Sequence, residues 1–355
     1  MKIWWIRDQD TIGFNRPSVW FVIGRKGAGK SACLEHIGEG YLAEGNSVLD
    51  MFGSRDGEGL AWLRSEHAKD KKILLIHGDN VSVSGSFDTR GISKLDLNDF
   101  NKYDILISAS PLYSGMDDEY FHVNHMIDTL YNRLEFNKLT YMIVREAGNL
   151  LYSRLRVSPN QLTAKTETTY LIREGRHCGI ALGLDTLKYT TIESDIRVQI
   201  DFTIFKSLGI DGFPDSRKFL YGFLNPAMVR NMPAKFFFIV SAKGPIGVGK
   251  FPCPPWHKQE RENIVKAVGL KIERGEVIDY GKNRGAFKTV GDEEHVAAVD
   301  EYFNGSSMCK LARKLGRSSA TIMAQVHSHD EAIEKNGYCY RCRRLKGKHE
   351  AEKTR

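Results

Sequence analysis

The eight residues from Gly24 to Ser31 constrain the fold of this chain more than any other segment. They read Gly-Arg-Lys-Gly-Ala-Gly-Lys-Ser, which is the complete G-x-x-x-x-G-K-[ST] pattern, and they follow the apolar run from Ser18 to Ile23. This pattern binds phosphate where a strand delivers the loop and a helix leaves it. Because the apolar run precedes the loop and a helical pattern over about residues 30–44 follows it, we expect a nucleotide-binding loop.

The residue types of this loop follow from the chemistry of phosphate. Glycines let the backbone turn tightly, so that successive amide groups point at phosphate oxygens, and the positive end of the following helix faces the same anion. We expect Lys30 to reach the β and γ phosphates and the Ser31 hydroxyl to ligate Mg²⁺. The residues expected to bind ATP are Gly24, Arg25, Lys26, Gly27, Ala28, Gly29, Lys30, Ser31 and Ala32.

A second match to the pattern lies at residues 244–251. It keeps the spacing up to Lys250, but Phe251 replaces the hydroxyl residue and cannot ligate a metal. The prolines that follow, at positions 252, 254 and 255, would prevent a helix from starting there. We expect this match to be a β-hairpin turn.

Apolar runs alternate with helical patterns through most of the chain. The runs are continuous, which is typical of strands buried on both faces of a mostly parallel sheet. We expect a doubly wound αβα domain, a P-loop NTPase of the RecA-like, additional-strand type. The expected strands are residues 18–23, 47–51, 72–76, 104–108, 140–144, 179–183, 201–205 and 235–240, the last starting an antiparallel edge hairpin, and the expected helices are 59–66, 117–136, 160–176 and 192–198.

Three short helical patterns lie near the C-terminus, over residues 293–303, 307–315 and 318–325. Their spacing is that of a helix-turn-helix module, in which Ser318 would cap the helix that enters a DNA groove. A small helical bundle that serves only oligomerisation is the alternative. We divide the chain into an ATPase domain (1–258), a linker with a connecting helix (259–290), a helix-turn-helix domain (291–326) and a basic tail with a zinc knuckle (327–355).

The positive charge is concentrated at the C-terminal end. The formal net charge is +7, and residues 335–355 hold eight Lys or Arg against two Glu, so residues 1–334 carry only +1. Such a tail is typical of nucleic-acid contact or of a solvated end. No run approaches the roughly 20 apolar residues of a membrane span, and the first residues do not resemble a signal peptide. We expect a cytoplasmic protein.

Hydrolysis of ATP also requires an acid that orients the attacking water. A later apolar strand ends in Arg145-Glu146, where P-loop hydrolases place two acidic residues, and we expect Glu146 to be catalytic. Arg145 stands where an aspartate normally holds the water shell of Mg²⁺. Either Ser31, water and Glu146 suffice, or Asp50 or Asp185 supplies the missing acid. In the alternative, Glu146 pairs with Arg145 at the surface and hydrolysis is slow or absent.

Polar residues at the end of the following strand are placed to sense the γ phosphate. Asp185 and Thr186 occupy this position. An arginine that reaches the nucleotide of a neighbouring subunit would make hydrolysis depend on ring assembly. The candidates are Arg173, Arg176 and Arg197, each of which would otherwise be a salt-bridge partner.

Together these motifs resemble the FtsK and HerA superfamily of ring-forming ATPases, which includes DNA translocases, conjugation pumps and viral packaging motors. The resemblance covers about residues 17–258 and rests on the phosphate loop, the Glu146 strand, the segment from Gly175-Arg176 to Gly179-Ile180 and the Pro-rich residues 251–256. It implies that Lys30 and Ser31 bind nucleotide and Mg²⁺, that Glu146 activates water and that Thr186 lies near the sensor position. It also implies a C-terminal DNA-binding helical domain.

Two histidines and two cysteines near the C-terminus predict a metal site. His327, His329, Cys339 and Cys342 provide two imidazoles and two thiolates, which is a tetrahedral Zn²⁺ set. If His327 ends the recognition helix, His329 and His349 are alternative ligands. Without metal, the cysteines would be reduced thiols in a flexible tail.

The sequence therefore favours an ATP-driven motor on double-stranded DNA that forms a ring of identical copies, expected to be a hexamer. The alternative is a DNA-binding protein of the partition or replication-initiation type, in which ATP switches assembly without translocation. Arg145 favours this second hypothesis. A small-molecule kinase would leave the C-terminal helices without a role.

Overall fold

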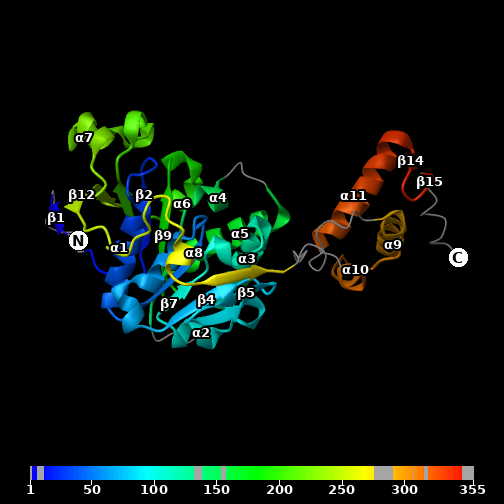
Figure 1. The fold of residues 1–355 in the computed structure, drawn as a ribbon. Coiled ribbons are helices and arrows are strands. Elements are labelled where there is room, and N and C mark those ends of the chain that lie inside the picture. The colour runs from blue at the N-terminus through cyan, green and yellow to red at the C-terminus, as the bar shows by residue number, and fades with distance from the viewer. Residues whose placement is uncertain are drawn as a thin grey trace. The chain divides into compact units, whose positions relative to one another are not determined.

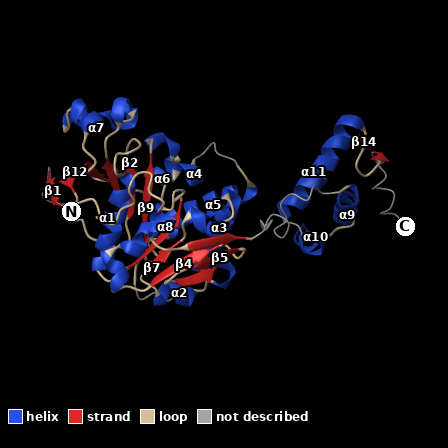
Figure 2. Cartoon of the chain, viewed as in Figure 1, coloured by secondary structure: helices blue, strands red, loops and turns tan. Residues whose placement is uncertain are grey.

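The computed structural model describes residues 2–5, 12–131, 138–152, 157–275, 291–306, 308–315 and 319–345. These residues form two compact units, with the division at Ile278/Asp279, and Figures 1 and 2 show the elements of each. The α-helices are α1 (Lys30–Ala43), α2 (Leu97–Lys102), α3 (Met116–Tyr131), α4 (Gly148–Leu151), α5 (Pro159–Glu174), α6 (Ser194–Arg197), α7 (Pro226–Asn231), α8 (Ile264–Ala267), α9 (Asp292–Phe303), α10 (Met308–Leu315) and α11 (Ser319–Asn336).

An 11-stranded sheet forms the centre of the first unit, in the order β1-β12-β11-β10-β2-β9-β8-β3-β7-β4-β6. The strands from β10 to β6 are parallel to one another, while β1, β12 and β11 pair antiparallel at the other end. The strands are β1 (Lys2–Trp5), β2 (Val19–Ile23), β3 (Ser47–Phe52), β4 (Ile73–His77), β5 (Val81–Ser84), β6 (Asp88–Gly91), β7 (Ile105–Ile107), β8 (Thr140–Val144), β9 (Ile180–Thr186), β10 (Phe202–Phe205), β11 (Phe236–Ser241), β12 (Gly244–Lys250), β13 (Lys271–Arg274), β14 (Tyr338–Cys339) and β15 (Arg344–Leu345).

Both faces of this sheet are covered, as the continuous apolar runs predict. Phe21 of β2 belongs to a core with residues of α3 and α5, whereas Trp20, its neighbour in sequence, packs with residues of α1. Successive side chains of a strand point to opposite faces, so every residue of β2 is buried. The mixed α/β class with a large, mostly parallel sheet is confirmed, and β9 lies between β2 and β8 as the additional strand.

The second glycine-rich match differs from its prediction. Its residues form strand β12, the turn of the hairpin lies before Gly244, and β1 pairs outside it, so the hairpin is not the sheet edge. Packing explains its glycines: a Cβ at Gly249 would lie 2.0 Å from Cζ of Phe237, and one at Gly247 would lie 2.3 Å from the Trp4 carbonyl oxygen. The spacing that imitates a phosphate loop is therefore a requirement of strand packing.

Several expected helices have other forms. Residues 59–66 form two 3-10 helices, Glu58–Arg64 and Glu66–Lys69, and further 3-10 turns span Ile92–Lys94, Ser110–Leu112, Tyr189–Thr191, Gly209–Asp211 and Asp215–Gly222. The expected helix at 117–136 is described only to Tyr131, where α3 ends, because residues 132–137 lie outside the described part of the chain. No described helix is long and apolar enough to cross a membrane.

The segment expected to be a linker contributes to the first unit instead. Strand β13 pairs with β5, and Ile264 of α8 is buried in the core that covers α1. Arg64 fixes the residues that lead into this segment. Its Nε donates to the Trp256 carbonyl at 2.7 Å and its Nη2 to Glu262 Oε2 at 3.0 Å. Residues 276–290 lie outside the described residues.

The described residues of the second unit form three helices and a two-stranded hairpin, β14–β15. Ala298, Leu311 and Ile322, one from each helix, form its apolar core. Helix α11 is longer than expected, because the buried residues Ile322, Val326 and His329 continue one helical face, and it ends before Gly337 at φ 65°. His327 and His329 therefore lie on a helix and not in a tail, while Ser318 and residues 346–355 lie outside the described part of the chain.

Candidate nucleotide site

The loop between β2 and α1 has the geometry of a phosphate cradle. Gly27 and Gly29 adopt φ values of 73° and 78°, which glycine alone accepts readily. At the start of the loop, Gly24 allows close approach, since a Cβ there would lie 2.7 Å from Cβ of Lys206. In the described part of the chain, the amides of Lys26, Gly27 and Gly29 have no protein acceptor, so these three donors are available to an anion at the start of α1.

The Lys30 side chain lies next to the strand that separates β2 from β8. Its Nζ is 3.5 Å from Oδ2 of Asp185, and both side chains are buried. Burial raises the pKa of Asp185 to about 6, although the Lys30 charge opposes that rise. Asp185, one of the two acids that the sequence offered, is thus a buried carboxyl with a raised pKa beside the phosphate loop.

Glu146 follows β8 and is joined to the same aspartate. Its backbone N–H donates to Asp185 Oδ1 at 2.7 Å, and its φ is 46°. A positive φ is unfavourable for a residue with a side chain and is often found at functional sites. The Glu146 side chain is exposed. Residues of three strand ends, β2, β9 and β8, therefore meet through Asp185.

Arg145 does not pair with Glu146 at the surface. Its guanidinium is 1% exposed and lies among Asp50, Glu35 and Glu58, with the nearest oxygens at 2.5, 3.0 and 3.3 Å. Burial lowers the pKa of Arg145, but the charges of Asp50 and Glu35 outweigh it and raise the pKa well above its ordinary value. Asp50 accepts hydrogen bonds from both Arg145 and Trp62. It is therefore a buried partner of Arg145.

Glu58 is a site residue that sequence reasoning missed. Burial would raise the pKa of its carboxyl, but the charge of Arg145 and the nearby Ser31 hydroxyl lower that pKa below its usual range. Glu58 is therefore an ionised acid near Ser31, the proposed Mg²⁺ ligand, and it forms an ion pair with Arg145. The only sequence signal was an acid between two glycines, Gly57 and Gly59. Because glycine is common in turns of every kind, this pattern alone does not predict a metal ligand.

The remaining sequence-predicted residues have partners within the chain. Thr186 is buried, and its hydroxyl lies 2.8 Å from that of Thr191, while its carbonyl accepts from Gly24. Arg176 pairs with Asp201 at 2.5 Å and Arg173 with Asp195 at 3.2 Å; the Arg197 guanidinium lies 4.9 Å from the Tyr189 ring centroid. The sensor and arginine-finger roles remain predictions.

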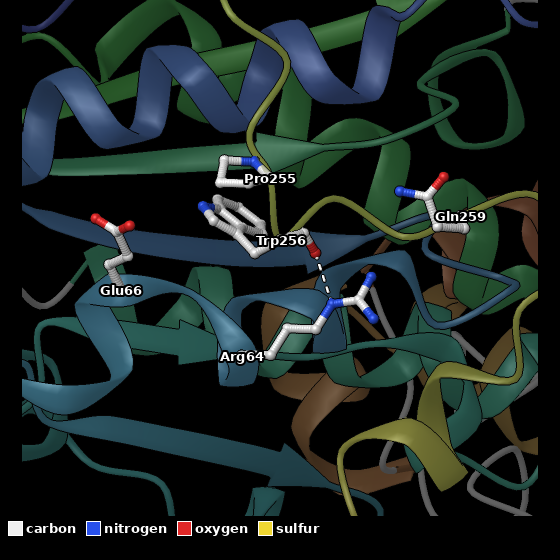
Figure 3. A pocket seen from close by; sticks show the side chains of 5 residues that line it. All are labelled: Arg64, Glu66, Pro255, Trp256 and Gln259. Carbon is white, nitrogen blue, oxygen red and sulfur yellow. Dashed lines mark hydrogen bonds between the residues drawn. The ribbon is translucent and has the colours of Figure 1, made fainter.

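A hollow in the first unit lies apart from the phosphate loop. It is lined by Arg64, Glu66, Pro255, Trp256 and Gln259, and Figure 3 shows Arg64 directed at the Trp256 backbone. The hollow belongs to the anchor that fixes the Pro-rich residues to α1: Trp256 Nε1 donates to Glu39, and His257 Nδ1 lies 2.7 Å from Glu35 Oε2. None of residues 24–32 lines it, so we do not assign nucleotide to this hollow.

Three of the four predicted metal ligands come together in the second unit. Ligand atoms of His295, His329, Cys339 and Cys342 all lie within 4.8 Å of one another, and all four residues are buried. His327 is exposed and lies outside this cluster. The fourth member is His295 of α9, which is 44 residues from Cys339 in sequence; its spacing gave no signal of the contact. His349 lies outside the described residues.

No family model and no curated protein matches the chain, but it is similar in fold to several solved structures. One is the genome-packaging NTPase B204 of Sulfolobus turreted icosahedral virus 2 with ATP-gammaS, at 15% identity and a TM-score of 0.38, over 67% of this chain and 98% of that one. The pCW3 conjugation coupling protein TcpA with ATPgS matches at 14% and 0.40, over 67% and 61%. The bacterial conjugative coupling protein TrwBdeltaN70 matches at 8% and 0.48, over 73% and 92%.

Proposed function

We propose that the first unit binds and hydrolyses ATP. The observation that carries this proposal is the junction of three strand ends, where the open amides of the phosphate loop, Lys30 and Glu146 meet around Asp185. Lys30 would contact the β and γ phosphates, and Glu146 would orient the attacking water as a general base. Asp185 would position both, because it holds the Lys30 ammonium and the Glu146 backbone.

Mg²⁺ fits the donors at the start of α1. Ser31 would supply a hydroxyl, and Glu58 would supply a carboxylate whose pKa is lowered by Arg145 and by this hydroxyl; oxygen donors of this kind suit Mg²⁺, which keeps several waters. The ion would neutralise charge that develops on the phosphates. Glu58 would thus be the acid near Mg²⁺. Residue 145 is an arginine, and Asp50 is not available because it pairs with Arg145.

Turnover of ATP by matched variants tests this assignment. Lys30→Ala should abolish ATP binding or turnover, while Glu146→Gln should bind ATP without hydrolysing it. The chain offers its own control in Lys250, the lysine of the glycine-rich match that forms β12: Lys250→Ala should turn over ATP at the wild-type rate. Normal turnover in the first two variants would overturn the assignment.

We also propose that the second unit binds double-stranded DNA in the manner of a helix-turn-helix domain. From residue 302 to 329 the chain contains Lys310, Arg313, Lys314 and Arg317 and no acidic residue. This stretch covers α10, its connection to α11 and the first half of α11. Basic residues there would contact phosphates while the start of α11 enters a groove.

The salt dependence of DNA affinity tests whether these basic residues contact phosphates. Each phosphate contact contributes about 0.9 to the slope of log affinity against log salt, so the triple variant Lys310→Ala, Arg313→Ala, Arg317→Ala should lower the slope by up to about 3. Lys335→Ala is the matched control, since Lys335 is exposed on the same unit but pairs with Glu331. An unchanged slope in the triple variant would move DNA contact to another surface.

With both units together, we propose a motor that moves double-stranded DNA, acting as a ring of identical copies. The second candidate is a nucleotide-switched DNA-binding protein without translocation, which is favoured by the unusual Arg145. Stimulation of ATP turnover by DNA, absent in Lys30→Ala, supports the motor. Binding of ATP with no turnover, with or without DNA, supports the switch.

A further inference from the structure

We propose that the second unit holds a structural zinc ion on His295, His329, Cys339 and Cys342. The four side chains come from three different elements: α9, α11 and the β14–β15 hairpin. Zn²⁺ favours such a set of two thiolates and two imidazoles in tetrahedral geometry. The site goes beyond the proposed ATPase and does not depend on it.

The distances of two donor pairs are close to those of ligands that share one small ion. Cys339 Sγ lies 3.6 Å from His295 Nε2, and Cys342 Sγ lies 3.2 Å from His329 Nδ1. Bonds of about 2.0–2.3 Å from zinc to nitrogen and sulfur place tetrahedral ligands roughly 3.3–3.8 Å apart.

Neighbouring residues orient the His295 ring for metal binding. His295 Nδ1 lies 3.1 Å from Gln325 Oε1, and the same oxygen accepts from Arg341 Nη1 at 2.6 Å. Because arginine only donates hydrogen bonds, this oxygen is an acceptor, and Nδ1 of His295 must carry the proton. The lone pair of Nε2 then faces Cys339. A second partner of this kind is the usual support of a metal-binding histidine.

A structural ion would also explain how so small a unit is stabilised. Its described apolar side chains that are buried, apart from the two cysteines, are few: Ala298, Val299, Leu311, Ile322 and Val326. A unit of this size gains folding energy from a bound metal that it cannot obtain from a small core. The ion would fix α9, α11 and the hairpin as one body and so set the geometry of the helices proposed to contact DNA.

Metal analysis of the whole chain, purified without chelator, tests the proposal. We expect about one zinc per chain in the wild type, and at least about a fivefold loss in His295→Asn and in Cys342→Ser. His327→Asn is the matched control: it changes an exposed histidine on α11 that the sequence favours as a ligand, and zinc content should not change. Full zinc in His295→Asn, or loss in His327→Asn, would overturn the ligand assignment.

A second measurement avoids variants that fail to fold. After zinc is removed from the wild-type protein under reducing conditions, titration with Co²⁺ should give the visible bands of tetrahedral cobalt with a thiolate charge-transfer band, saturating at about one ion per chain. Absence of these bands together with absence of zinc overturns the proposal. A disulfide between Cys339 and Cys342 in the protein as purified, shown by mass spectrometry, would also overturn it.

Discussion

The Nζ atom of Lys30 lies 3.5 Å from Oδ2 of Asp185. This contact links the phosphate-binding loop to the strand that separates it from Glu146, since the other oxygen of Asp185 accepts the Glu146 amide. A nucleotide phosphate and Asp185 would compete for the same ammonium. If Lys30 exchanged Asp185 for a phosphate, Asp185 could shift, and the backbone of Glu146, the proposed catalytic residue, would shift with it.

The ionisation of Asp185 makes this link dependent on pH. Burial raises its pKa from 3.8 to about 6, so between these values the folded chain binds a proton that the unfolded chain has released. Stability contributed by this group is complete below about pH 4 and falls as pH rises towards 6. Relative to the wild type, Asp185→Asn should thus gain up to about 3 kcal/mol between pH 4 and 6, at 1.36 kcal/mol per pKa unit. Denaturant unfolding of both proteins at several pH values measures this change; a difference independent of pH would contradict it.

Removal of Arg145 should lower the free energy of unfolding. Loss of the guanidinium leaves the buried Asp50 without its ion-pair partner and the buried Glu35 with His257 alone, and breaking a buried pair in this way costs about 3–5 kcal/mol. We expect this loss in the free energy of unfolding of Arg145→Met. Arg173→Met is the control, because the Arg173 and Asp195 side chains are 41% and 66% exposed and such a pair contributes less than about 1 kcal/mol. Equal losses in the two variants would mean that the Arg145 cluster is not a stabilising unit.

The features that could be predicted from the sequence are those encoded by short, contiguous segments. The phosphate loop and the strands that carry it are contiguous in sequence, so period and glycine placement are sufficient to find them. The partners of Arg145 are not contiguous: Glu35 lies on α1 and Asp50 on β3. The contact between His295 and Cys339 likewise depends on how α9 packs on α11, which no spacing encodes. Strand β5 was missed because it is half exposed and pairs outside the main sheet.

Gly53 supports the strand end that carries Glu146, and its substitution should be costly. Its φ is 82°, and a Cβ there would lie 1.8 Å from the Arg145 carbonyl oxygen, a backbone atom that cannot move without Glu146. Gly45 has almost the same φ, 80°, but no atom within 4 Å of its Cβ position. Gly45→Ala should therefore cost about 1–2 kcal/mol for the left-handed backbone alone, and Gly53→Ala clearly more, with lower ATP turnover. Thermal unfolding and turnover of the pair measure the difference, and equal effects would exclude the close approach as the cause.

Glu58 should set the Mg²⁺ requirement of the proposed hydrolysis. The charge of Arg145 and the nearby Ser31 hydroxyl lower the pKa of its carboxyl, so Glu58→Gln removes a negative charge from the ion's neighbourhood while Arg145 keeps Asp50 and Glu35. A lost charged contact of about 1.4 kcal/mol corresponds to a tenfold weaker affinity, and we expect the Mg²⁺ concentration for half-maximal turnover to rise by about this factor. Glu66→Gln, on an exposed acid of the next 3-10 turn, should leave it unchanged. If Glu58→Gln lowers turnover equally at all Mg²⁺ concentrations, Glu58 acts on the fold of the loop through Arg145 and not on the ion, and Ser31 with water must hold the metal.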